Sequence, residues 1–155
     1  MDEKYMNRED QTLRVLTILL RASGSVINML KKDMSTYGVN PTEFTVLEVL
    51  YSLGEQPIQI IGNKVLLASS SITYVIDQLE KKGMVERIQS EEDRRVTLVS
   101  LTEKGEDLME DVFPQHSDII DRLFKDLSDK ELSEFGESLK TVGYQAVDLY
   151  DEIED

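Results

Sequence analysis

A short amphipathic helix followed at once by two β-rich segments is the feature that most constrains the fold of this chain. In residues 70–82, SSITYVIDQLEKK, apolar side chains at positions 72, 75, 76 and 79 share one helical face. Gly83 then ends the helix. Residues 85–89 and 96–101 predict two strands, because both are rich in β-branched or large apolar side chains. The sequence therefore predicts a helix packed against a β-hairpin whose tip lies within residues 90–95.

Three further helices are predicted upstream of this unit. Residues 11–34 place leucine and isoleucine near helical spacing and predict one long helix. A second helix begins with Asn40 as N-cap, Pro41 in the first position and Glu43 in the third, and it ends at Gly54. Pro57 opens a short third helix. A short helix, a capped second helix and a hairpin in this order form a winged helix–turn–helix.

Two long helices are predicted after the hairpin. Thr102 caps the first of them, and Pro114 is expected to kink or split it. A capping box from Ser128 to Glu131 starts the last helix, and we expect its end, residues 148–155, to fray.

The predicted fold is mainly α-helical with a small β-hairpin wing. Residues 37–102 form the winged helix–turn–helix domain, and residues 1–36 and 103–155 form a helical region. The apolar stripes of this region need a partner to bury them, and a homodimer supplies one. We therefore expect the helical region to dimerise.

The charge of the chain is unevenly distributed. The net charge is -14 over 155 residues, yet residues 57–104 carry 7 basic and 7 acidic side chains, whereas residues 105–155 carry 4 and 16. The basic residues of the middle segment cluster at 81–82, 87 and 94–95. DNA binding needs local positive charge rather than a basic protein, so an acidic chain of this pattern remains compatible with it.

Other functions are disfavoured by composition. The chain has no cysteine, which excludes disulfides, thiolate metal sites and thiol-based redox sensing. We see no secretion signal in residues 1–11 and no apolar run near the roughly 18 residues that span a bilayer, so we expect a cytoplasmic protein without membrane contact. His116 is the only histidine, which argues against a metal site. No catalytic constellation is present, and we expect neither an enzyme nor a cofactor.

Three stretches resemble the MarR family of transcription regulators: SITYVIDQLEKKGMVER, DRRVTLVSLTEKG and LSDKELSEFGESLK. The resemblance covers about residues 10–145. It implies a homodimer that binds a pseudo-palindromic operator in double-stranded DNA, usually as a repressor. A small aromatic or phenolic ligand, or an oxidant, often releases such proteins. The stretch from Phe113 to His116 resembles a branch that includes regulators responding to quinones and small phenols, but the lack of cysteine departs from the oxidant-sensing branch.

The 70–82 helix is the predicted recognition helix. Ser70 and Ser71 can donate to phosphate, while Thr73, Tyr74 and Gln78 can reach base edges in the major groove. Asp77 could accept a hydrogen bond from a cytosine amino group, or repel phosphate and tune the register. The alternative reading of this polar face is a solvated surface with no ligand.

Arg94 and Arg95 lie at the predicted wing tip, where an arginine can enter a narrow minor groove. By resemblance, Asp93 and Arg95 match the Asp-x-Arg pair of the family, in which the aspartate holds the guanidinium. Strand alternation would direct Arg94 towards a phosphate, and the sequence leaves open which arginine takes which role. Lys64 and Lys82 are candidate phosphate contacts. The alternative reading is a solvated turn in which both arginines pair with acidic neighbours.

Met34, Tyr37 and Phe44 are the candidate ligand-binding residues. They lie around the turn between the first two helices, where the helical region and the winged domain are expected to meet. A different class of function also stays open, namely a winged-helix module that binds a ligand or another protein and no longer binds DNA.

Overall fold

A computed structural model describes residues 7–65 and 71–154 of the chain. The chain divides into two compact units, Met1–Phe113 and Pro114–Asp155.

The first unit begins with the long helix α1, Arg8–Met34, followed by the 3-10 turn η2, Ser35–Tyr37. Asn7 caps α1 by accepting a hydrogen bond from the Asp10 amide at 2.8 Å, so the helix begins earlier than predicted and ends where predicted. Most of α1 is exposed, including an apolar group made up of Leu13, Val15, Leu16, Ile18 and Leu20. By length and composition, Arg8–Tyr37 would also suffice to cross a membrane, although none of its apolar window is buried within the structure.

Helices α2, Pro41–Leu53, α3, Ile58–Lys64, and α4, Ile72–Lys81, form the helical part of the winged domain. The predicted capping box of α2 is confirmed: Asn40 accepts from the Glu43 amide and Glu43 accepts from the Asn40 amide, each at 2.9 Å. The core of this domain is apolar and fully buried at its centre, where Phe44, Leu47, Ile61, Ile76, Leu79 and Val99 lie.

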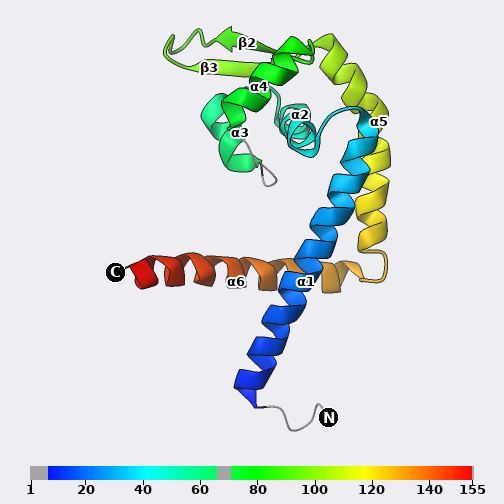
Figure 1. Ribbon diagram of the computed structural model, residues 1–155, viewed down its shortest axis with the longest axis vertical. Helices are drawn as coiled ribbons and strands as arrows, with labels where there is room; N and C mark the ends of the chain where they lie inside the picture. The colour runs from blue at the N-terminus through cyan, green and yellow to red at the C-terminus, as the bar shows by residue number, and fades with distance from the viewer. Residues whose placement is uncertain (1–6, 66–70, 155) are drawn as a thin grey trace. The chain divides into compact units, whose positions relative to one another are not determined.

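A three-stranded antiparallel sheet completes the domain, with β3, Thr97–Leu101, between β1, Gln56–Pro57, and β2, Val85–Gln89. β2 has the predicted bounds and β3 starts one residue later than predicted. Figure 1 shows β2 and β3 as a hairpin that extends beyond α4. β1 was not predicted, because it has two residues and one of them is a proline, which offers no donor to a strand ladder.

Helix α5, Glu103–Leu123, starts at the base of this hairpin. Its predicted cap is confirmed, since Thr102 Oγ1 accepts from the Gly105 amide at 3.2 Å. Gly105 lies so close to β2 that an added Cβ would be 2.1 Å from the Met84 carbonyl oxygen. Pro114 lies inside α5 without dividing it, so the predicted split does not occur.

The second unit contains the end of α5 and the helix α6, Asp129–Glu154. The predicted capping box is confirmed, because the Ser128 amide donates to Glu131 at 2.9 Å and the Glu131 amide donates back to Ser128 Oγ at 3.4 Å. α6 continues to Glu154, so the predicted fraying of residues 148–155 is wrong for all but the last of them, which lies outside the described residues. One side of α6 exposes large apolar residues, among them Leu132, Phe135, Leu139 and Val142.

Candidate nucleic-acid interface

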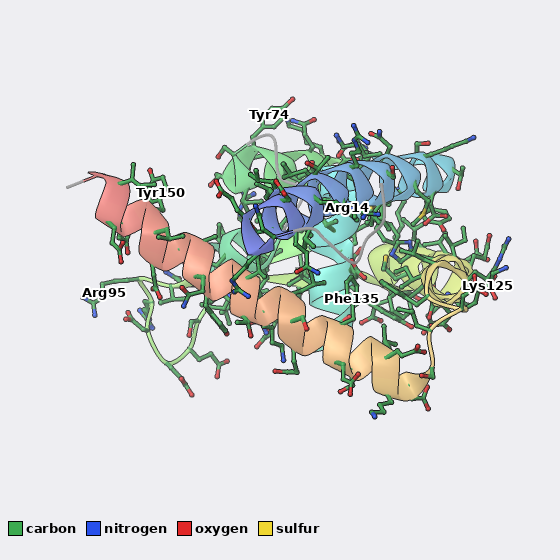
Figure 2. All side chains as sticks on the ribbon, turned by 90° about the horizontal axis from the view of Figure 1, so that it is seen from below. Arg14, Tyr74, Arg95, Lys125, Phe135 and Tyr150 are labelled. Carbon is green, nitrogen blue, oxygen red and sulfur yellow. The ribbon has the colours of Figure 1, made fainter. Side chains whose placement is uncertain are left out.

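Helix α4 separates an apolar face from a polar one. Val75, Ile76 and Leu79 are buried, whereas Tyr74 is 57% exposed. Figure 2 shows the Tyr74 side chain projecting away from the helix.

The other predicted reading residues lie on the same helix or at its start. Thr73 is exposed and Gln78 half-buried. Ser71 is the exposed N-cap residue, and its side chain makes no capping hydrogen bond. Ser70 lies outside the described residues.

Asp77 and Glu80 also lie on α4, and both accept hydrogen bonds from the guanidinium of Arg87 on β2. Burial lowers the pKa of Arg87, but the hydrogen bonds and charges of the two carboxylates outweigh it and raise that pKa above its usual value. The sequence suggested that Asp77 could contact a DNA base, and it did not predict the ion pair between Asp77 and Arg87. The available signal was strand alternation, which places Arg87 on the same face of β2 as the buried Val85.

The hairpin tip carries Arg94 and Arg95 in a turn between the two strands. Asp93 accepts three hydrogen bonds from Arg95: from the amide at 3.0 Å, from Nε at 3.1 Å and from Nη2 at 3.2 Å. These bonds hold the pKa of Asp93 below its ordinary value. The Arg95 side chain is nevertheless 90% exposed and projects outward (Figure 2).

Arg94 takes part in the turn through its backbone. Its carbonyl accepts a hydrogen bond from the Gln89 side-chain amide at 2.7 Å, and its side chain is exposed. Gln89 was not predicted as a site residue, and a bond to a turn carbonyl leaves no mark in a sequence pattern.

The two candidate phosphate lysines differ in their surroundings. Lys64 is exposed in the last turn of α3. Lys82 donates to both carboxylate oxygens of Glu43, at 2.8 and 2.7 Å, and the Glu43 side chain is only 3% exposed. The structure therefore gives the Lys82 ammonium a partner within the protein.

The candidate ligand residues Met34, Tyr37 and Phe44 do lie together. Met34 and Phe44 belong to the core, and the rings of Tyr37 and Phe44 are 5.2 Å apart. The Tyr37 hydroxyl donates to Asp33 Oδ1 at 2.6 Å. Burial, followed by this hydrogen bond and the charge of Asp33, raises the pKa of Tyr37 far above its usual value, so the hydroxyl stays protonated. Within the described residues, no group of three or more histidine or acidic side chains is placed to hold a metal.

An exposed polar helix face beside a hairpin with an outward arginine at its tip defines a winged helix–turn–helix protein of the DNA-binding class. A family model described as the MarR family matches residues 39–97. The HTH-type transcriptional regulator MhqR of Bacillus subtilis (strain 168) is 47% identical over 137 residues, which cover 88% of this chain and 94% of MhqR. The chain belongs to the MarR family, whose members are typically dimeric DNA-binding repressors.

Solved structures agree with this fold. NMB1585, a MarR family regulator from Neisseria meningitidis, superposes with a TM-score of 0.73 at 24% identity, covering 95% of this chain and 99% of that one. NadR in complex with 4-hydroxyphenylacetate superposes with a TM-score of 0.69 at 18% identity, covering 92% of this chain and 96% of that one.

Proposed function

We propose that this protein is a cytoplasmic, homodimeric repressor that binds a pseudo-palindromic operator in double-stranded DNA. The observation that carries the proposal is the exposed face of α4 next to a hairpin whose tip presents Arg95. A helix of this kind fits the major groove, and an arginine on a thin hairpin fits the neighbouring minor groove.

In this proposal Thr73, Tyr74 and Gln78 contact base edges, and Ser70 and Ser71 contact phosphates at the start of the helix. Arg95 enters the minor groove. The two bonds from its guanidinium to Asp93 support this assignment, because they orient the guanidinium before DNA arrives and so reduce the entropy lost on binding. Arg94 and Lys64 then contact phosphates.

Dimerisation is supported by the apolar residues that α1 and α6 expose. Leu16 and Leu20 of α1 are 50% and 64% exposed, and Phe135 and Val142 of α6 are 44% and 50% exposed. An exposed apolar surface on this scale marks an interaction site. A second copy of the chain would cover this apolar surface. The dimer would then place one recognition helix on each half of the operator.

We also propose that a small phenolic or aromatic ligand releases the DNA. The NadR complex shows that a protein of this fold binds such a compound. Met34, Tyr37 and Phe44 are the proposed contacts. Because Met34 and Phe44 are 2% and 0% exposed, a ligand can reach them only if the junction between α1 and α2 repacks. Through this repacking, ligand binding would change the conformation of the winged domain.

The first experiment is selection of bound duplexes from a random library, followed by titration of the enriched duplex. We expect Arg95→Ala to weaken binding by about 1–3 kcal/mol and to leave the dimer intact. Lys125→Ala, which removes one exposed positive charge from the second unit, is the matched control and should bind as the wild type does. Failure to enrich any duplex would refute the proposal and favour a winged-helix module that binds a ligand or a protein. The same titration with phenols and quinones added tests release.

A further inference from the structure

A three-residue ion cluster joins the recognition helix to the wing. Arg87 on β2 donates a hydrogen bond to Asp77 through Nη2 and another to Glu80 through Nη1. Glu80 lies about one turn after Asp77 on α4. The Asp77 and Glu80 side chains are 46% and 43% exposed, whereas that of Arg87 is 25% exposed.

The position of the two carboxylates is a problem for DNA binding. They lie on the exposed side of the helix that is proposed to enter the groove, where phosphates line both edges. Unpaired carboxylates there would repel DNA, and the repulsion would be strongest at low salt. Within Ile72–Lys81 the one basic residue is Lys81, at the end of the helix.

We infer that Arg87 is a positioning residue for DNA recognition, which acts through Asp77 and Glu80 by neutralising both carboxylates, so that the recognition helix can approach the phosphates without repulsion. The inference rests on the proposed DNA-binding function. Arg87 belongs to β2, and β2 continues into the tip that carries Arg95. A single guanidinium thus links the element that reads the major groove to the element that enters the minor groove.

Two other roles fit the geometry less well. A direct phosphate contact by Arg87 would require a free guanidinium edge facing outward, but both terminal nitrogens donate to carboxylates and three-quarters of the side chain is covered. A direct base contact by Asp77 would have to use Oδ2, because Oδ1 accepts from the Arg87 guanidinium.

The test compares four proteins on the duplex that the wild type enriches: wild type, Arg87→Gln, the double variant Asp77→Asn/Glu80→Gln, and the combined triple variant. Affinity is measured across a range of salt concentrations. We expect Arg87→Gln to bind roughly tenfold more weakly at low salt, with a shallower salt dependence, because it uncovers two negative charges. The triple variant should recover to within about threefold of the wild type, since removing the carboxylates removes the repulsion.

Each other outcome has a definite meaning. Wild-type affinity for Arg87→Gln, or a triple variant as weak as Arg87→Gln, would overturn the inference, and the second result would identify Arg87 as a direct DNA contact. Circular dichroism and size exclusion report whether each variant folds and dimerises. If Arg87→Gln does not fold, the Asp77→Asn/Glu80→Gln variant tests the inference instead. It should bind the duplex at least as tightly as the wild type does, and weaker binding would overturn the inference. Failure of the wild type to enrich any duplex would instead refute the proposed function.

Discussion

Replacement of Lys82 by methionine should destabilise the winged domain by about 2 kcal/mol. Lys82 donates two hydrogen bonds to Glu43, whose carboxylate is almost completely buried and also accepts from the Asn40 amide. Hydrogen bonds to charged groups contribute about 1.5–3 kcal/mol, and breaking a fully buried ion pair costs about 3–5 kcal/mol. The Lys82 side chain is 41% exposed, which places the expected loss at the lower end of this span. Methionine keeps most of the aliphatic stem and removes only the ammonium.

The measurement is thermal unfolding at one fixed protein concentration, because the stability of a dimer depends on concentration. For a chain of this length, about 2 kcal/mol corresponds to a fall in Tm of roughly 4–8 °C. Glu43→Gln supplies the control background. There the buried negative charge is gone, so Lys82→Met should cost less than about 0.5 kcal/mol.

A DNA titration of the same variants separates structure from binding. If Lys82 acts only through Glu43, Lys82→Met in the Glu43→Gln background should leave the salt dependence of operator binding unchanged. A decrease of about one in the slope would show that the ammonium contacts a phosphate, as the sequence suggested. Equal destabilisation by Lys82→Met in both backgrounds would refute the ion-pair reasoning altogether.

Three further predictions concern other parts of the chain. Tyr37→Phe should cost about 1 kcal/mol in chemical denaturation, because it removes the hydrogen bond to Asp33, and an unchanged midpoint would contradict this. The lowered pKa of Asp93 means that its bond to Arg95 stabilises the tip at pH values above about 3.9, its value in an unfolded chain, and is lost as the pH falls through the lower folded value. NMR titration of the carboxyl should therefore give a midpoint below about 3.9, and a midpoint at or above that value would contradict the bond. Phe135→Glu should convert the dimer to monomers in analytical ultracentrifugation, and a dimer of undiminished affinity would exclude this part of α6 from the interface.

Local chemistry explains what the sequence predicted correctly. The cap of α2 depends on residues three positions apart, and the bounds of β2 follow from a run of suitable side chains closed by Gly83 on one side and polar residues on the other. Such signals lie within a few residues of the structure they determine. The order of the elements then indicated that the helix and the hairpin belong to one winged helix–turn–helix.

Contacts between distant residues explain what the sequence did not predict. Glu43 and Lys82 are 39 positions apart, so nothing near Lys82 indicated that its ammonium was already paired. Arg87 was counted with the basic cluster, although two carboxylates on α4 engage it. Charges that appear free in a sequence are often neutralised in the fold, whereas Lys64, Arg94 and Arg95 are exposed.

The contact between Gly105 and Met84 has a consequence for how an effector could act. Thr102 adds to it, donating through its amide to the Met84 carbonyl at 3.1 Å and through its hydroxyl to the Gly83 carbonyl at 2.6 Å. The backbone at Gly105 lies directly against the backbone at Met84. No side chain lies between these two segments, so none can change rotamer and absorb a displacement. We therefore expect the first turn of α5 and the base of the hairpin to move as one rigid unit. In the proposed dimer, a displacement of the start of α5 would therefore move the base of the hairpin with it and would change the distance between the two recognition helices.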